Sequence, residues 1–294
     1  MAALAPSLPT PVSRSPTLLR VKQAMWRHPT AIVGGVVLLG LIAMALLAPY
    51  LGTVDPQAIS PVRRLRQPSS IYWFGTDMLG RDVYSRVVFG ARVSLAVGLS
   101  VAVLATTIGL AIGLVTGFIR WLDGMVMRVM DGLMSIPGVL LAIALMALTK
   151  ASLQNVIVAI TITEVPRVVR LIRGLVLSLR EQAYVDAAIA SGTPTPAILL
   201  RHILPNTIAP LLVQGTYICA SAMLTEAILS FLGAGTPLNI PSWGNIMAEG
   251  RSLFQLANYL IFFPGMFLSL AVLSVNLLGD GMRDALDPRL ARNM

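Results

Sequence analysis

Three acidic residues stand inside apolar stretches of the sequence, where a charge is expensive. Glu226 lies within SAMLTEAILSFLG, and Glu164 and Asp131 lie in other apolar stretches. A charged side chain at the centre of a bilayer costs about 2.5–3.5 kcal/mol on insertion scales, so it must face protein or water. These residues are therefore candidates for lining a translocation path. For Glu226 the alternatives are a structural partner within a helix bundle and a position near the interface.

The sequence contains no recognised catalytic or nucleotide-binding motif. The two lysines, Lys22 and Lys150, do not lie in G-x-x-x-x-G-K-[ST], and no G-x-S-x-G, H-E-x-x-H or C-x-x-C occurs. The two histidines, His28 and His202, are far apart, and the single cysteine, Cys219, cannot form an internal disulfide. We expect no catalysis, no bound cofactor and no metal in this chain.

The composition is that of an integral membrane protein. Of the 294 residues, 56% are hydrophobic and 12% are charged, and the mean hydropathy is +0.78, whereas soluble domains carry about 25% charged residues. The net charge of +9 comes from Lys and Arg in short segments between apolar runs, which is typical of membrane orientation and contact with anionic lipid. We therefore expect a lipid bilayer, and no nucleic acid, as a partner.

Six apolar runs predict six transmembrane helices in one all-α membrane domain. The first, Ala31 to Leu51, is about 31 Å long as a helix, which matches the hydrocarbon core and indicates an uncleaved span. The fourth has a short apolar core, VIVAITI, followed directly by Glu164, Pro166 and Arg167. The five later spans are predicted at 92–118, 126–148, 153–172, 207–231 and 259–279.

The distribution of positive charge favours cytoplasmic termini. With six spans and a cytoplasmic N-terminus, 14 of the 22 Lys and Arg residues lie inside and 8 lie outside. The expected layout is a disordered cytoplasmic segment 1–30, a membrane domain 31–280 and a cytoplasmic tail 281–294. Six arginines in or beside the first outer loop oppose this orientation: Arg63, Arg64, Arg66, Arg81, Arg86 and Arg92.

Two helix faces carry regular patterns. Arg167, Arg170 and Arg173 recur at spacing three on one side of the fourth span, where we expect a lipid-facing anchor or part of a docking surface. In the second span, small residues recur at every fourth position. They predict close helix packing within the chain or against a partner, the alternative being a pore-lining face. These residues are Ala105, Gly109, Gly113 and Gly117.

The segment between the fourth and fifth spans carries turn and cap signals. From Glu181 an acidic first turn leads through small residues to Gly192, a natural left-handed stop. Thr195 then predicts an N-cap with Pro196 at the first helical position, and Pro205 closes a second helix of about 13 Å, too short to span. That helix is apolar almost all round, so it must be buried against the membrane domain, lipid headgroups or a soluble partner.

These residues resemble the cytoplasmic EAA loop of ABC importer permeases, which follows E-A-A-x-x-x-G-x(9)-I-x-L-P. Asp replaces the usual Glu, and His202 takes the position of Ile, which moves to Ile203. The loop covers about 177–206 and includes Arg201 in the stretch RHILPN. The matching positions are Asp186, Ala187, Ala188, Gly192, Leu204 and Pro205.

Further stretches extend the resemblance over most of residues 70 to 290. They are FGTDMLGRDVYSRVVFGARVSL, LSLREQAYVDAA, RHILPNTIAPLLVQ, LSFLGAG with PSWGNIM, and DGMRDALDPRL. Together they are similar to the second of the two permease subunits in the dipeptide/oligopeptide/nickel subfamily. The chain departs from that pattern at 164–166 and at 193–196, where Pro194 and Pro196 have no evident role beyond stiffening the turn.

The resemblance implies a type I ABC importer permease with six transmembrane helices and a cytoplasmic coupling helix, in the bacterial cytoplasmic (inner) membrane. It implies a heterodimer with a second homologous permease, two cytoplasmic ATPase subunits that bind ATP and Mg, and an extracytoplasmic substrate-binding protein. The solute would be a di- or oligopeptide, glutathione, a nickel chelate or another small molecule, because selection in this family lies mainly with the binding protein. The residues implied in ATPase coupling are Asp186, Ala187, Ala188, Gly192, Arg201, Leu204 and Pro205.

Two other functions compete with ATP-driven import. A secondary transporter driven by an ion gradient would explain the intramembrane acids, but six spans without an evident internal repeat fall short of the common paired-repeat designs. A structural or assembly protein of the membrane would need no transport activity at all. Uptake measured with and without nucleotide distinguishes the three.

Overall fold

The computed structural model describes residues 29–286, and the segments 1–28 and 287–294, which include most of the predicted terminal segments, lie outside this range. The long helices are α2 (Pro29–Leu46), α3 (Val83–Phe118), α6 (Leu153–Leu179), α9 (Leu204–Phe231) and α11 (Tyr259–Leu286). The shorter elements are α4 (Arg120–Met134), α5 (Gly138–Ala147), α7 (Ala183–Ala190), α8 (Thr195–Ile198), α10 (Trp243–Gly250), η1 (Ala48–Tyr50), η2 (Pro61–Arg63), η3 (Leu199–Ile203) and η4 (Arg251–Leu253). Within the described range, β structure is limited to one isolated bridge between Thr76 and Asp82. The predicted all-α class is confirmed.

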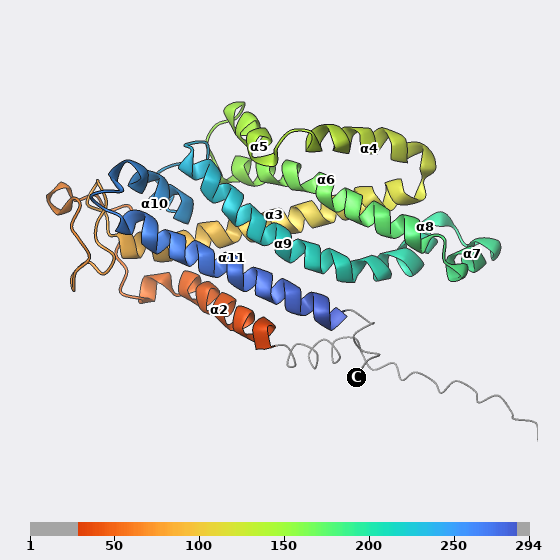
Figure 1. Cartoon of the computed structure of the whole chain (residues 1–294), viewed down its shortest axis with the longest axis horizontal. Helices are drawn as coiled ribbons and strands as arrows, with labels where there is room; N and C mark the ends of the chain where they lie inside the picture. Colours follow the sequence, from red (N-terminus) through yellow and green to blue (C-terminus); the bar gives the residue numbers. More distant parts are fainter. Residues whose placement is uncertain (1–28, 287–294) are drawn as a thin grey trace, which may run out of the picture.

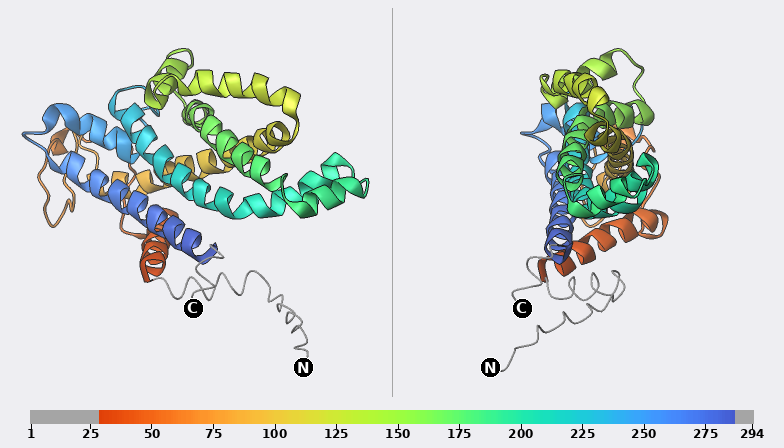
Figure 2. Two further views of the ribbon diagram at one scale, coloured as in Figure 1. Left: turned by 45° about the vertical axis from the view of Figure 1, so that its right-hand side comes forward. Right: turned by 90° about the vertical axis from the view of Figure 1, so that its right-hand side faces the viewer.

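The long helices form a bundle in which α3 lies behind α6 and α9 in the view of Figure 1. α3 packs mainly against α6 and α9, and α11 packs against α2 and α9. In both Figure 1 and Figure 2, α4 and α5 lie on one side of the bundle, and α2 lies on the opposite side. Residues 47–82 and α10 lie at one end, which we call the loop end, and α7 and α8 lie at the other, which we call the α7 end.

Length and composition identify fewer spans than the six predicted. Four helices are long and apolar enough to cross a membrane: α2, α3, α11, and the continuous helix from Thr195 to Phe231. A fifth span results if α4 and α5 are one broken span. α6, with 27 residues, is long enough, but Glu164, Arg167, Arg170 and Arg173 make it too charged to qualify. Whether α6 can cross a membrane therefore depends on how its charges are neutralised.

The third span, predicted as one helix over 126–148, is broken. α4 and α5 meet at an angle of 87°. Pro137 explains the break, because its ring disfavours helical backbone at the preceding residue and it has no N–H to donate. Ser135 closes α4 by donating its backbone N–H to the carbonyl of Asp131 and its hydroxyl to the carbonyl of Gly132. The bend opens a hollow against the neighbouring helices.

The first span also ends earlier than predicted. α2 stops at Leu46, and Pro49 lies in the following turn η1. Pro49 cannot donate to the carbonyl of Ala45, and the Nε of Arg92 donates to that carbonyl instead, at 2.5 Å. An arginine counted among the outer-loop charges therefore closes a helix end. The second helix, α3, begins at Val83, nine residues before the predicted start.

The small-residue face of α3 packs inside the chain. Ala105 is fully buried. A Cβ atom added at any of the three glycines would come within 2.5–2.7 Å of a branched side chain of α6, so only glycine allows this approach. The contacting pairs are Gly109 with Val168, Gly113 with Ile172, and Gly117 with Val176.

We expect Gly113→Ala to lower the melting temperature of the protein in detergent. The added methyl group would lie 2.7 Å from the Cβ of Ile172, and overpacking costs about 1–3 kcal/mol, more than the roughly 1 kcal/mol that alanine gains over glycine in a helix. Gly124→Ala in α4 is the matched control, because nothing lies within 4 Å of its Cβ position. Thermal unfolding followed by size-exclusion chromatography measures both variants. Equal stability would contradict the close contact between α3 and α6.

Candidate functional site

Between α6 and α9 the chain extends out of the bundle through α7 and α8 (Figure 1). α7 stops at Gly192, whose φ of +74° lies in the left-handed region. The N–H of Gly192 donates to the carbonyl of Ile189 at 2.9 Å, and the N–H of Thr193 donates to that of Ala188 at 3.1 Å. This pair of bonds is a Schellman motif. The predicted left-handed stop is confirmed.

The second half of this segment differs from the prediction. Thr195 is the first helical residue, it follows Pro194, and its side chain forms no cap. Pro205 does not close the helix, since α8 passes through the π-helical turn η3 directly into α9. The N–H of Leu204 donates to the carbonyl of Leu199, five residues back, and this wider turn accommodates the proline that follows. The prediction of a separate 13 Å helix is therefore wrong, and the segment is continuous with α9, which is long and apolar enough to span a membrane.

We call residues 181–206 the α7–α8 segment. Val185, Ile198 and Ile203 are buried in the membrane domain and hold the segment against it. Its outward surface combines polar groups with apolar side chains, as a binding surface does. Exposed residues are Tyr184, Asp186, Ala187, Ile189, Gly192, Leu200, Arg201 and Pro205, and Ala188 and Leu204 are half-buried.

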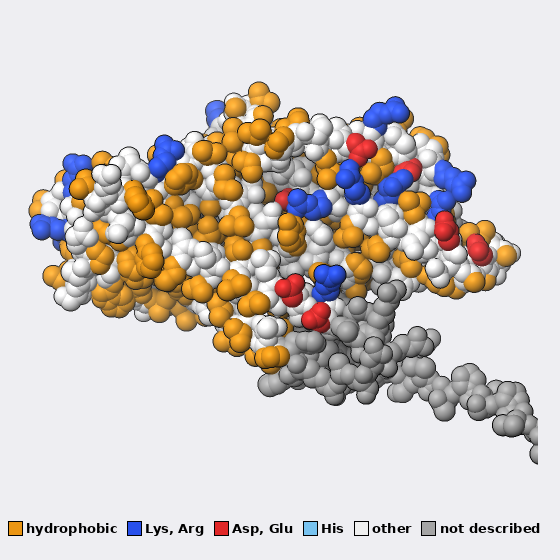
Figure 3. Space-filling model, viewed as in Figure 1, with side chains coloured by type: hydrophobic (Ala, Val, Ile, Leu, Met, Phe, Trp, Pro, Cys, Tyr) orange, Lys and Arg blue, Asp and Glu red, His pale blue; other side chains and the backbone are white. Residues whose placement is uncertain are grey.

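Two arginines of α6 face acids from α4. Nη2 of Arg170 lies 2.6 Å from Oδ1 of Asp131, and Arg173 binds Asp123 through two hydrogen bonds, of which Nη2 to Oδ2 is 2.7 Å. Figure 3 shows acidic and basic side chains together toward the α7 end, whereas the loop end of that face carries basic side chains among apolar and uncharged ones. Arg170 and Arg173 thus have partners within the chain, and the predicted lipid anchor or docking surface on this face stays a prediction. The ion pairs also explain how α6 keeps its charges within a membrane domain.

A polar cavity lies where the bend between α4 and α5 faces α6 and α9. Glu164 is 6% exposed, and its Oε1 accepts a hydrogen bond from the hydroxyl of Ser221 at 3.1 Å. Its Oε2 lies 3.2 Å from Nη1 of Arg167, an ion pair without hydrogen-bond geometry. The guanidinium of Arg167 lies over the ring of Tyr217, 5.4 Å from its centroid. The cavity, of about 280 Å³, is lined by residues of all four helices, including Thr225.

The polar cavity lies well inside the length of α6 and α9. Glu164 is eleven residues from the start of α6, and Ser221 is ten residues from the end of α9. At 1.5 Å per residue, both lie about 15–17 Å from the loop end of their helices. The polar side chains of α6 and α9 therefore meet away from the ends of both helices, at a depth close to half of the roughly 30 Å of a hydrocarbon core.

The three acids predicted to line a path lie in different surroundings. Glu164 lines the polar cavity, and Asp131 is exposed beside α6. Glu226 is fully buried, and its Oε1 accepts hydrogen bonds from the hydroxyls of Ser230 at 2.8 Å and Ser242 at 2.9 Å. Ser242 is the N-cap of α10, so Glu226 fixes that helix to α9. This geometry favours the structural alternative for Glu226, and its part in transport stays a prediction.

A cluster of four charges at the loop end has no counterpart in the sequence predictions. Nη1 of Arg86 lies 2.6 Å from both Asp77 and Glu249, and Nη2 donates to Glu249 at 2.9 Å. Arg81 binds the same acids, at 2.6 and 2.7 Å. Two positive and two negative charges thus cancel while joining residues 47–82, α3 and α10. The i,i+4 spacing of Asp77 and Arg81 is a local signal, but Glu249 is 163 residues from Arg86.

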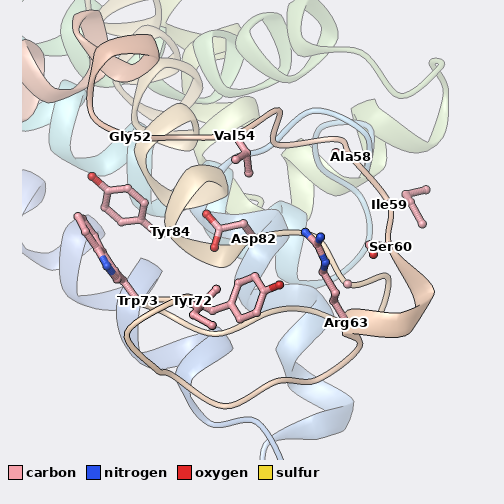
Figure 4. A pocket seen from close by; sticks show the side chains of 12 residues that line it. Gly52, Val54, Ala58, Ile59, Ser60, Arg63, Tyr72, Trp73, Asp82 and Tyr84 are labelled. Atoms are coloured by element: carbon pink, nitrogen blue, oxygen red, sulfur yellow. The ribbon is translucent and has the colours of Figure 1, made fainter.

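A cavity of about 540 Å³ lies within the loop of residues 47–82 and the start of α3 (Figure 4). Trp73 and Tyr84 stand at one side of it with ring centroids 4.8 Å apart, and Arg63 stands at the other. The carboxylate of Asp82 is held by the backbone N–H and hydroxyl of Ser85, at 2.8 and 2.5 Å. The lining of this cavity thus combines three aromatic rings with aliphatic side chains and the charged groups of Arg63 and Asp82.

Metal ions in proteins are bound by groups of His, Cys, Asp and Glu side chains. Between residues 29 and 286, no three or more His, Cys, Asp and Glu side chains are grouped so as to hold one.

Known proteins resemble this chain over nearly its whole length. Residues 88–292 match the family described as the binding-protein-dependent transport system inner membrane component, and residues 19–68 match the N-terminal transmembrane domain of oligopeptide transport permease C. A probable peptide ABC transporter permease protein of Sinorhizobium fredii is 52% identical over 284 residues, which cover 96% of each chain. A dipeptide transport system permease protein of Alkalihalophilus pseudofirmus is 41% identical over 265 residues, covering 90% of this chain and 87% of the relative. A glutathione transport system permease protein of Pectobacterium atrosepticum is 39% identical over 286 residues, covering 95% of each.

We expect Glu249→Gln to destabilise the loop end. The substitution leaves Arg81 and Arg86 with one acid, and removing one partner of a buried ion pair costs about 3–5 kcal/mol. Limited proteolysis of residues 47–82 and thermal unfolding in detergent measure the effect. Glu181→Gln, at an exposed position, is the control and should change neither readout. A Glu249→Gln protein as resistant and as stable as this control would show that the cluster does not hold the loop.

Proposed function

We propose, since the chain belongs to the family of binding-protein-dependent transport system inner membrane components, that its α7–α8 segment couples ATP hydrolysis in partner subunits to solute movement across the membrane. The chain is a permease subunit of an ABC importer and is not itself an enzyme. Its partners include ATPase and substrate-binding proteins. The observation that carries the coupling role is the unbroken helical path from α8 through η3 into α9.

That path makes the α7–α8 segment a stiff lever. The Schellman motif at Gly192 fixes the direction of α7 relative to α8, and buried Ile198 and Ile203 fix α8 to the bundle. A force applied to the exposed surface at Asp186, Ala187 and Arg201 therefore moves α9 as a rigid body rather than bending a linker. Since α9 also carries Ser221 of the polar cavity, movement of the segment reaches the middle of the membrane directly.

We infer that the α7 end faces the cytoplasm, where the ATPases hydrolyse ATP, and that both termini lie on that side of a bacterial inner membrane. The positive-inside count supports this orientation. The outer arginines that opposed it are partly accounted for, because Asp77 and Glu249 neutralise Arg81 and Arg86. The loop end, with the cavity of residues 47–82, then faces the substrate-binding protein.

A complete transporter on this proposal contains a second homologous permease and two ATPases. The chain alone leaves half-exposed charges on α6, with Arg167 at 45% and Arg170 at 50% of their side-chain surface. Such groups are too costly to face lipid, so the face that carries them points toward the second permease and the path between the two subunits. Glu164 and Asp131 are our candidates for lining that path.

The proposed solute is a peptide or a similar small molecule. The relatives named above carry peptide, dipeptide and glutathione in their names, and these solutes share a free carboxylate and an amide backbone. The test is uptake of a labelled dipeptide and of glutathione into proteoliposomes that hold the full complex, with and without ATP. ATP-dependent uptake of either supports the proposal. Uptake that ignores ATP and follows a proton gradient would contradict it and indicate a secondary transporter.

We expect Gly192→Val to reduce ATP-driven uptake severalfold in an assembled complex. Nothing lies within 4 Å of the Cβ position, so the effect comes from the backbone, where a left-handed conformation costs a non-glycine residue roughly 1–2 kcal/mol. Gly192→Asn is the matched control, because asparagine tolerates that conformation. Uptake and substrate-stimulated ATPase activity are measured for both. Full activity of the valine variant would refute the lever, and equal losses in both variants would point to a lost contact at the surface instead.

A further inference from the structure

We propose that Arg167 binds a carboxylate group of the solute while the solute crosses the membrane, so that the polar cavity is a selective anion site within the path. This inference rests on the proposed import function and adds a contact and a solute chemistry to it. The cavity lies between the break at Pro137 and the facing sides of α6 and α9. Four observations support it.

The first observation is that the guanidinium of Arg167 has donors to spare. Among residues 29–286, its partners are the ion-paired Oε2 of Glu164 at 3.2 Å and the ring of Tyr217. Neither is a hydrogen-bond acceptor in good geometry, so the N–H groups of Arg167 are left for another acceptor. A guanidinium presents paired donors that match the two oxygens of a carboxylate.

The second observation is the position of Arg167 in the membrane. It lies fourteen residues into α6, about 21 Å from the loop end, and 45% of its side chain is exposed. A half-exposed cation at this depth cannot face hydrocarbon without a large cost. On the proposed function it faces the second permease and the path between the two subunits, where water or a solute can reach it, and the cavity beside it supplies the space.

The third observation is that its neighbours hold Arg167 in place without satisfying it. Glu164 is buried, and its carboxylate accepts a hydrogen bond from the hydroxyl of Ser221. The negative charge of Glu164 therefore balances the positive charge of Arg167 without using its hydrogen-bond donors. The ring of Tyr217 holds the plane of the guanidinium, since a cation and an aromatic face attract each other. A site that is neutral overall binds a carboxylate weakly enough to release it, as a transport path requires.

The fourth observation is the size of the cavity. Its volume of about 280 Å³ is at or below the lower limit of ordinary small-molecule pockets. It admits one end of a peptide rather than the whole molecule. The terminal carboxylate is the group that such a cavity and such a cation recognise together, and Arg167 is accordingly a specificity-determining residue.

The test uses the intact complex in proteoliposomes, with Cys219 replaced by alanine and Thr225→Cys placed in the cavity wall. Two thiol reagents of equal size, an anionic sulfonatoethyl and a cationic aminoethyl methanethiosulfonate, are compared by their rates of modification. We expect the anionic reagent to be favoured. Arg167→Gln should lower the anionic-to-cationic rate ratio about tenfold, Glu164→Gln should raise it, and the double variant should fall between them. A site that serves structure alone would shift the ratio equally, or not at all, in both single variants.

Transport provides the second readout. With the binding protein saturated, Arg167→Gln should lower the turnover of the dipeptide that the complex carries, and Arg167→Lys should restore part of it. Arg251→Gln is the matched control, because that guanidinium also lies over an aromatic ring, Phe231 at 5.5 Å, but outside the cavity. The inference is overturned if Thr225→Cys reacts with neither reagent, or if Arg167→Gln changes neither the rate ratio nor turnover. The import function is tested separately, by ATP-dependent uptake in the parent complex. If the parent complex shows this uptake, the import function holds even though the inference about Arg167 has failed. If it shows none, the import function fails as well.

Discussion

A charge inside the hydrocarbon core of a membrane must be paired or must reach water, and the arrangement of this bundle follows from that constraint. α6 carries four charged side chains between residues 164 and 173. Two of its arginines bind acids from α4, which holds that amphipathic helix against the bundle. The third, Arg167, has a single acid beside it and remains half-exposed. On our proposal, the helix crosses the membrane with this polar face turned away from lipid.

The same constraint links the two ends of the molecule. At the loop end, four charges cancel in a buried cluster, so a long irregular segment is fixed to α3 and α10 without leaving an unpaired charge. At the α7 end the buried side chains are instead apolar, and polar and apolar side chains share the exposed surface. The helix that begins in that exposed segment reaches the polar cavity without a break. On our proposal, movement at the α7 end is transmitted along this helix to the polar cavity.

Local signals in the sequence predicted the features that depend on neighbouring residues. The all-α class followed from apolar runs, and the stop at Gly192 followed from the conformational freedom of glycine. Contacts between distant residues could not be predicted in this way. The partner of Arg86 is Glu249, and the partner of Arg173 is Asp123, both far along the chain. Two prolines affect their helices differently: Pro137 breaks the helix between α4 and α5, whereas a π turn accommodates Pro205. The sequence alone does not distinguish the two cases, because the difference depends on the packing around each proline.

The central claim is that the face carrying Arg167 and Arg170 lines a polar path and does not face lipid. Spin labels on cysteines at two positions of equal depth test it directly in the assembled complex. Gly138→Cys lies in the cavity wall, 3.8 Å from Thr163 by its Cβ position, and Val36→Cys lies on the exposed apolar face of α2, about 15 Å from its loop end. We expect a water-soluble nickel complex to relax the label at 138 more strongly than oxygen does, and the reverse at 36. A label at 138 that responds mainly to oxygen, like the one at 36, would contradict the claim.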